Sequence, residues 1–565
     1  MLVGSVAVTC WAFRDVLSRL STSVPGDLGD PAYFAWQLAW VRHALTTHPG
    51  GLWTTPAFLR APDNLAYTDT VLGYTPLGAF VPDGPAGGVL LLNLATLAAG
   101  ALAVAGAYAL ARAMGCGPAA ALVAGAGAGF APWRLGQVIH VNVLSTGGIA
   151  LALALLARGT GWSLRRGWEP ERTSWRWVAA GWAVACYQVT FGFALGIWFV
   201  HTLGVVLAAW SLGWLVSGRR RARPVRSVLV AHGVGGALFA GTVLALLPPY
   251  LRVLAAHPEA RRGEDRLPLF SPPWRGLLTA PDTSWWWGDR QAAWRGGLRW
   301  PPEMALSPGL VLLALAVTGV FVSVWPWRRR LGLLVVTAAL TVLAMGTAFP
   351  LGHGAWTYLP LYRHVPGWSA MRTPGRLMVW VTLGLCLLAA GAVARMGAWT
   401  ASWARREGRG TRARRAGAVA AVLVVAVPMV LVVGEGLNRT PHPAVARAPV
   451  SLRTLAPPIL ILPSDDLGDY QLMLWGADGW PVLANGNSGF EPVRQRALRV
   501  QVASFPDAAS VAALRARGIR TVLLVPSRLT PGSPWAAAAD KPVDGLALTR
   551  TAAGDAVIYH LPPSP

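Results

Sequence analysis

The feature that most constrains the fold of this chain is a long series of apolar stretches of membrane length. A helix needs roughly 20 apolar residues to cross the hydrocarbon core of a bilayer, and about eleven stretches approach or reach that length. Only 13% of the 565 residues are charged, against about 25% in soluble domains. We therefore predict an all-α polytopic membrane protein with about eleven transmembrane helices. The candidate spans are residues 2–13, 87–111, 118–133, 138–157, 177–195, 197–216, 227–247, 306–326, 331–349, 377–395 and 416–434.

The arginines between these stretches predict an orientation. They gather in four short segments, at residues 158–176, 219–226, 328–330 and 405–415. An even number of candidate spans separates each pair of segments, so all four can lie in the cytoplasm, as the positive-inside bias requires. The N-terminus is then cytoplasmic. The extracytoplasmic segments are the loops 14–86, 248–305 and 350–376 and the tail from about residue 435.

The charge pattern also excludes some classes of function. The formal net charge of +24 is carried by arginines beside spans, which is the ordinary pattern of a membrane protein, so we do not expect nucleic acid as a partner. Ion-coupled transporters usually carry carboxylates at mid-membrane depth. No Asp or Glu falls within a candidate span. This counts against transport and places any polar chemistry at the outer face.

The first outer loop contains GDLGDPAYFAWQLAWVRHAL, residues 26–45. Asp30 and Pro31 predict a helix start, with Asp30 as N-cap and Pro31 at the first helical position. The aromatic residues that follow predict an amphipathic helix lying flat on the membrane surface. Two interpretations stay open. Either Asp30 only caps this helix and Asp27 occupies a glycine-rich turn, or the two carboxylates take part in chemistry.

Two further outer segments carry polar residues that could join them. PDNLAYTDT contains Asp69, which is either a turn residue or a second carboxylate facing Asp30. In PWRLGQVIHVN, the spacing of Arg134, Gln137 and His140 places them on one face of a helix at the outer boundary. These side chains either line a polar pocket or form structural hydrogen bonds.

Arginines in the loop 350–376 run against the positive-inside bias. Arg372 and Arg376 lie one helical turn apart at the mouth of the next span. Such a pair can clamp a phosphate or pyrophosphate, or the two side chains can extend to lipid headgroups. The loop 248–305 contains SWWWGDRQAAWRGGLRW, which suits either an aromatic membrane-interface belt or stacking on sugar rings.

The tail predicts a small soluble α/β domain. Residues 457–464, 520–527 and 555–562 are strand candidates. Residues 507–518 predict a capped helix closed by Gly518. We therefore divide the chain into a transmembrane domain, residues 1–434, which includes the external loop 14–86, and an extracytoplasmic domain, residues 435–565.

Taken together, these segments resemble the GT-C superfamily of polytopic glycosyltransferases, in particular its uncharacterised bacterial members. The likeness is carried by GDLGDPAYFAWQLAW, YTDTVLGYTPLGA, PWRLGQVIHVN and LYRHVPGWSAMRTPGRLMVWV, and in the tail by NGNSGFEP and ALRARGIRTVLLVP. Members of this superfamily use an acidic residue of the first external loop, at or near a DxD, ExD or DD pair, as base or metal ligand. Here Asp27 and Asp30 are spaced more widely. The spacing leaves open whether they bind a divalent cation such as Mg or Mn, or whether Asp30 alone is the base.

The resemblance implies an enzyme of the bacterial inner membrane that moves a sugar from a polyprenyl-phosphate carrier to an extracytoplasmic glycan, lipid or protein acceptor. Asp30, with Asp27 as a possible partner, would be catalytic. The substrate-binding residues would be Asp69, Arg134, His140, Arg372 and Arg376. The alternatives are a lipid or polysaccharide transporter or flippase, and a non-catalytic membrane scaffold.

Overall fold

The computed structural model describes residues 2–216, 226–404 and 411–562, and the chain forms two compact units. The first unit contains Met1–Arg14, Thr96–Ala245 and Arg262–Thr440. The second contains Asp15–Ala95, Leu246–Arg261 and Pro441–Pro565. The first outer loop therefore groups with the tail, whereas the sequence assigned it to the transmembrane domain. The segments with Arg219–Arg223 and with Arg405, Arg406 and Arg409 lie outside the described residues.

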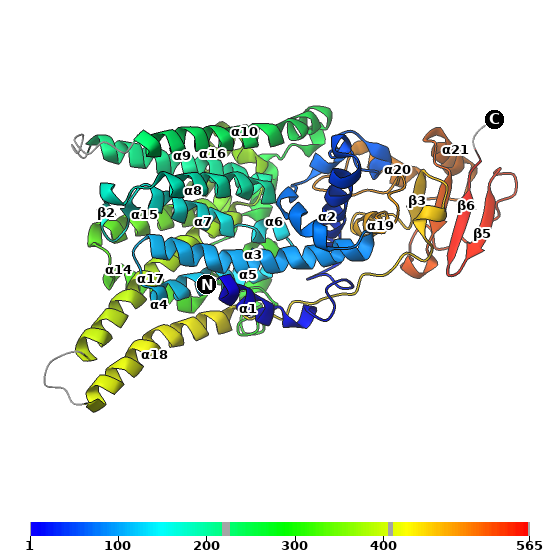
Figure 1. Ribbon diagram of the computed structural model, residues 1–565. Helices are drawn as coiled ribbons and strands as arrows, with labels where there is room; N and C mark the ends of the chain where they lie inside the picture. The colour runs from blue at the N-terminus through cyan, green and yellow to red at the C-terminus, as the bar shows by residue number, and fades with distance from the viewer. Residues whose placement is uncertain (1, 217–225, 405–410, 563–565) are drawn as a thin grey trace. The chain divides into compact units, whose positions relative to one another are not determined.

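Helices dominate the first unit, and they occur at all of the predicted spans (Figure 1). Within the described ranges, six helical segments are long and apolar enough to cross a membrane. They lie on α3 (Pro85–Ala113), α6 (Val141–Leu144) with α7 (Gly147–Gly159), α9 (Phe193–Val216), α10 (Arg226–Ala256), α17 (Met378–Ala404) and α18 (Thr411–Gly436). The chain is thus a mainly helical, multi-pass membrane protein. The other candidate spans form shorter or less apolar helices, namely α1 (Leu2–Ala12), α4 (Pro118–Phe130), α8 (Trp175–Gln188), α14 (Leu310–Phe321) and α15 (Trp327–Ala344).

Helix α17 lies at the centre of the first unit and packs against α4, α14, α15 and α18. Its membrane-length stretch is 83% buried. Small residues allow this close packing. A Cβ atom on Gly319 of α14 would lie 2.1 Å from the carbonyl oxygen of Leu388 in α17, so the two backbones approach each other too closely for any larger residue. The core of this unit is accordingly rich in alanine, as in α4.

One acidic residue departs from the expectation that the spans contain no carboxylate. Glu435 lies in the last turn of α18, and its side chain is buried. Its carboxylate accepts hydrogen bonds from the backbone N–H groups of Leu310 and Val311, at 2.6 and 2.9 Å, and from Nε1 of Trp287 at 2.8 Å. Glu435 therefore satisfies the unpaired donors at the start of α14, which is a structural role and not a transport site.

The tail of the second unit contains a four-stranded sheet in the order β3-β4-β6-β5 (Figure 1). Strands β3 (Ile459–Leu462) and β4 (Thr521–Leu524) are parallel, whereas β6 (Ala556–His560) is antiparallel to both β4 and β5 (Thr549–Ala553). Apolar residues cover both faces of β3 and β4. The predicted small α/β fold and its three strands are therefore confirmed, and β5 is an additional edge strand.

Three helices connect β3 to β4 in this sheet. They are α19 (Gly468–Trp475), α20 (Val493–Gln501) and α21 (Ala508–Ala516). The predicted cap of α21 is confirmed: the Asp507 side chain accepts the N–H of Ser510 at 2.7 Å, and the Ser510 side chain accepts the N–H of Asp507 at 3.1 Å. Gly518 follows this helix with a φ of 70°, a conformation that glycine adopts without strain.

Candidate functional site

The predicted site residues are divided between the two units. Asp27, Asp30 and Asp69 belong to the second unit, and Arg134, His140, Arg372 and Arg376 belong to the first. Each group is described within its own unit below.

Asp27 and Asp30 lie at the start of helix α2 (Asp30–Thr47). The N-cap position is Gly29 and not Asp30, so the predicted cap is wrong by one residue, and Asp30 lies in the first turn. A carboxylate there interacts favourably with the positive end of the helix dipole. Asp27 is exposed, and its Oδ1 accepts the N–H of Gly29 at 2.8 Å. Asp27 thus forms the turn that leads into the helix.

Helix α2 is not the surface helix that its sequence predicted. Every residue from Pro31 to Val41 is buried. The helix packs against α19 and against the 3-10 helix η5 (Leu72–Phe80) of the same unit, and the rings of Tyr33 and Tyr470 meet edge to face at 5.4 Å. Its aromatic residues therefore fill a protein core on all sides, so the interpretation as an amphipathic helix on the membrane surface is wrong.

A fully buried amide, Gln37, connects α2 to the segment with Asp69. Its Nε2 donates to the carbonyl oxygen of Asp69 at 3.0 Å, and its Oε1 accepts the N–H of Val71 at 3.2 Å. This paired contact fixes the backbone on both sides of residue 70 against the helix that begins with Asp30. Sequence reasoning missed Gln37. Its signal was a single polar residue within the apolar run FAWQLAW.

Electrostatic interactions connect Asp30 and Asp69 to two tyrosines of the second unit. Asp30 and Tyr250 act on Tyr33, and Asp69 acts on Tyr250. Burial, followed by the neighbouring Tyr470, raises the pKa of Tyr33 well above its usual value. Such interactions weaken over about 10 Å in salt. Together with the contacts of Gln37, these interactions place the segment with Asp69 against α2, although 39 positions in the sequence separate Asp69 from Asp30.

No metal site is evident around these carboxylates. Within the described ranges, no group of three or more His, Cys, Asp or Glu side chains is arranged to hold a metal ion. A divalent cation between Asp27 and Asp30 stays a prediction.

The tail contributes a second buried charge cluster that the sequence did not predict. Asp469 in α19 is fully buried and accepts hydrogen bonds from Arg499 at 2.9 Å and from the Asn485 side chain at 3.0 Å. Arg499 also donates to Glu491 at 2.7 Å. Burial raises the pKa of Asp469, and Arg499 opposes this shift. The cluster joins α19, α20 and the loop 485–491, so it stabilises the tail.

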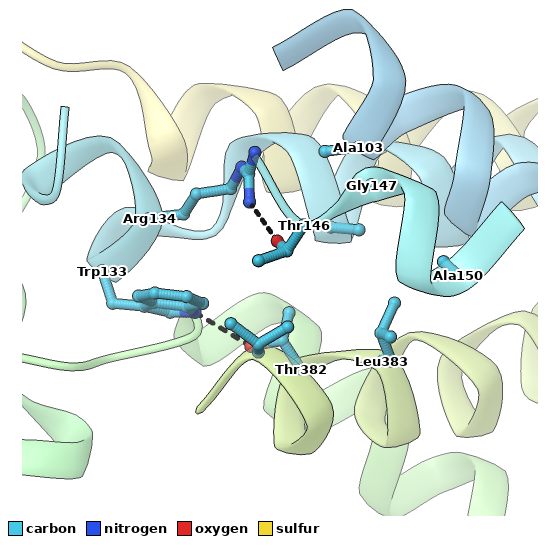
Figure 2. Close-up of a pocket in the computed structure, with 10 residues that line it drawn as sticks. Ala103, Trp133, Arg134, Thr146, Gly147, Ala150, Thr382 and Leu383 are labelled. Carbon is cyan, nitrogen blue, oxygen red and sulfur yellow. Dashed lines mark hydrogen bonds between the residues drawn. The ribbon is translucent and has the colours of Figure 1, made fainter. Parts of the chain in front are cut away.

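In the first unit, Arg134 is buried and hydrogen-bonded to its surroundings. Its guanidinium donates to the Thr146 hydroxyl at 3.1 Å, to the carbonyl oxygen of Ala99 at 3.2 Å and to that of Leu144. It borders a cavity of about 20 Å³, which has room for one water molecule. Figure 2 shows the guanidinium pointing toward Thr146, beside the contact of Trp133 with Thr382. Arg134 thus serves to hold α5 (Pro132–Gly136) against the start of α7.

The predicted common face of Arg134, Gln137 and His140 is only partly present. Helix α5 ends at Gly136, and α6 begins after His140, so one continuous helix does not carry the three residues. Gln137 and His140 still meet, with Oε1 and Nδ1 separated by 2.9 Å, and Gln137 donates to the carbonyl oxygen of Pro302 at 2.7 Å. Gln137 therefore attaches the α5–α6 turn to the short helix α13 (Pro301–Met304), and His140 contacts Gln137.

Arg372 and Arg376 do not form the predicted pair on one helical turn. Arg372 lies in an extended segment before the short helix η14 (Pro374–Leu377) and stacks over the ring of Phe270 at 4.7 Å. Arg376 lies within η14 and donates to Glu303 at 2.9 Å. Both partners of this ion pair are largely buried.

The first unit also contains a cleft of about 370 Å³, whose lining includes sequence neighbours of Phe270 and Glu303. It is lined by Ser271, Met304 and Arg299, among others. Ser271 is next in sequence to Phe270, whose ring Arg372 covers. Met304 is next in sequence to Glu303, which binds Arg376. The cleft is large enough for a small polar headgroup.

Comparison with known proteins supports the fold. No protein-family model matches the sequence, and no curated protein matches it. The cryo-EM structure of the arabinofuranosyltransferase AftD from mycobacteria aligns with 100% of this chain, with a TM-score of 0.56 and 14% sequence identity. The two proteins share a fold. The expected likeness to GT-C glycosyltransferases is therefore confirmed at the level of the fold.

This chain spans 41% of the length of AftD. The crystal structure of the Archaeoglobus fulgidus oligosaccharyltransferase aligns with 92% of this chain and 69% of its own length, at 12% identity and a TM-score of 0.44. That weaker likeness adds nothing to the conclusion about the fold.

Proposed function

We propose that this protein is a membrane glycosyltransferase that moves a sugar from a polyprenyl-phosphate carrier to an extracytoplasmic acceptor. The observation that carries the proposal is the contact of Gln37, which holds the segment with Asp69 against the helix that begins with Asp30. The fold shared with an arabinofuranosyltransferase supports it, and so does the predicted outward orientation of the first loop.

In this proposal the carboxylate of Asp30 accepts the proton of an acceptor hydroxyl group. The hydroxyl oxygen forms a bond to the anomeric carbon of the sugar as the bond from that carbon to the carrier phosphate breaks. The electron pair of the broken bond leaves with the polyprenyl phosphate. Asp69 and His140 are proposed to contribute polar contacts to the substrates, and Asp27 is the proposed partner of Asp30.

Arg372 and Arg376 are the proposed ligands of the carrier phosphate, where negative charge develops. The ion pair with Glu303 reduces the positive charge that Arg376 presents to such an anion. The cleft near Ser271 and Met304 is the proposed location of the phosphate within the first unit.

The test compares Asp30→Asn with wild type and with Asp544→Asn, which changes an exposed carboxylate of the tail. Purified proteins in nanodiscs receive a panel of polyprenyl-phosphate monosaccharides, including arabinofuranose, together with glycan acceptors. We expect wild type and Asp544→Asn to consume one donor, and Asp30→Asn to lose at least about 100-fold in kcat, as for removal of a general base. Full turnover by a folded Asp30→Asn protein would refute the assignment of the base. A wild type that consumes no donor would refute the proposed function.

A further inference from the structure

The loop 63–71 is held at three points by one distant segment of the second unit. Asp63 forms a two-point ion pair with Arg252, with both contacts at 2.7 Å. The hydroxyl groups of Thr70 and Tyr250 lie 2.9 Å apart. The Tyr67 hydroxyl lies 3.0 Å from Nε2 of His257. These contacts join residues 180 to 190 positions apart in the sequence.

The contact between Tyr67 and His257 is part of a hydrogen-bonded chain. Nδ1 of His257 lies 3.1 Å from Oε1 of Glu259, and the same oxygen accepts the N–H of Val493 at 3.3 Å. Although partial burial raises it, the pKa of Glu259 is lowered overall by hydrogen bonds from its own backbone, His257 and Val493. An ionised Glu259 requires His257 to donate through Nδ1–H, so Nε2 accepts the proton of the Tyr67 hydroxyl.

The order Tyr67, His257, Glu259 resembles the hydrogen-bonded series that activates a nucleophile, but Tyr67 is not placed to attack a substrate. Its side chain is only 4% exposed. Its ring packs against Phe58 and Phe490, with centroids 5.2 and 5.0 Å away. Burial raises the pKa of Tyr67 to about 12, which opposes formation of a nucleophilic phenolate. The chain therefore serves to hold the loop.

We propose that Tyr250, Arg252 and His257 form a clamp that positions Asp69 for the reaction, with Tyr67, Thr70 and Asp63 as the clamped residues. This inference rests on the proposed function. Asp69 lies between Tyr67 and Thr70, so two clamp contacts flank it along the chain. Gln37 holds the same backbone from the side of α2. A residue held from two sides loses little entropy when a substrate binds, which favours a productive geometry.

The experiment uses the full-length protein in nanodiscs and the variant Tyr67→Phe, which removes only the hydroxyl group. Amide hydrogen exchange is measured over residues 65–71, where Leu65, Ala66 and Val71 donate hydrogen bonds. The kinetic parameters are measured with the donor found active for wild type. We expect faster exchange in 65–71 and a kcat lower by about tenfold with unchanged KM. Glu259→Gln should give a smaller change in the same direction.

Tyr187→Phe, which alters an exposed tyrosine of the first unit, and Asp544→Asn are the matched controls and should behave as wild type. Unchanged exchange in Tyr67→Phe would overturn the clamp. Faster exchange with unchanged kcat would overturn its role in positioning Asp69. If wild type itself transfers no sugar, the proposed function fails and the positioning role fails with it, while the exchange measurement still shows whether the segment holds the loop.

Discussion

The two units place their buried polar groups in different settings. In the first unit, Arg134, Arg376 and Glu435 each meet backbone groups or an opposite charge from a neighbouring segment. In the second unit, the contacts of Gln37 and Thr70 hold the backbone around Asp69. A buried charge is tolerated in a protein interior when it is paired, so the first set should contribute mainly to stability. The carboxylates beside the tyrosines should contribute mainly to activity.

The largest effect that this comparison predicts is on the stability of Arg134→Leu. The substitution leaves the carbonyl oxygens of Ala99 and Leu144 without their buried donor, so we expect a loss of at least about 3 kcal/mol in the free energy of unfolding. Thermal unfolding followed by tryptophan fluorescence in nanodiscs measures this loss. Arg172→Leu, at a mostly exposed ion pair, is the control. A low turnover per folded Arg134→Leu molecule, with an unchanged unfolding temperature, would show that Arg134 binds the substrate. The first unit would then not differ from the second in the role of its buried polar groups.

A smaller effect is expected for Glu303→Gln, which keeps a hydrogen-bond acceptor for Arg376 but removes its charge. We expect a loss of about 1–2 kcal/mol in stability and, because Arg376 then presents its full positive charge, a donor KM lower by about threefold. Unfolding experiments and donor titrations measure the two changes. Glu264→Gln breaks an exposed ion pair with Arg363 and should change stability by less than about 1 kcal/mol. An unchanged KM in Glu303→Gln would remove Arg376 from the proposed phosphate ligands.

The smallest effect should appear at the helix cap in the tail, far from any candidate site residue in the sequence. Hydrogen bonds from Ser504 and Ser510 lower the pKa of Asp507. Its stabilising contribution is therefore present above the ordinary aspartate pKa and is lost as the pH falls through the lowered value. Asp507→Ala should weaken α21 by about 1 kcal/mol at neutral pH and by less in acid. Amide exchange of residues 508–516 in wild type and in Asp507→Ala, compared at neutral and at acidic pH, measures this difference. A difference between the two proteins that grows in acid would contradict the role of the ionised Asp507 as the helix cap.

Local patterns predicted much of the fold because they depend on neighbouring residues. The apolar stretches gave the positions of the helices, and the sequence around Asp507 and Gly518 gave a cap and a helix end that the structure contains. The same reasoning failed for α2. An aromatic-rich helix can lie on a membrane or in a protein core, and only the residues that pack against it, such as Tyr470, decide between them.

The candidate site was predicted less completely because its geometry depends on long-range contacts. The sequence suggested that Asp69 could face Asp30, and this pairing stays a prediction. However, the contacts of Gln37 with Asp69 and of His257 with Tyr67 have no local signal. The spacing of Arg134, Gln137 and His140 suggested one helix, but the chain turns after Gly136. A prediction from residue spacing assumes that the backbone is a regular helix throughout. The turn after Gly136 makes that assumption false.

The hydrogen bonds of Glu435 impose an order on the synthesis of the chain. Leu310 and Val311 leave the ribosome 125 and 124 residues before the carboxylate that caps them. At about 5–20 residues per second, this interval is roughly 6–25 seconds. The permanent acceptor of the first N–H groups of α14 is therefore made well after the helix itself. Helix α14 packs mainly against α17, so α18 supplies the last hydrogen bonds to a helix whose packing partner is already present.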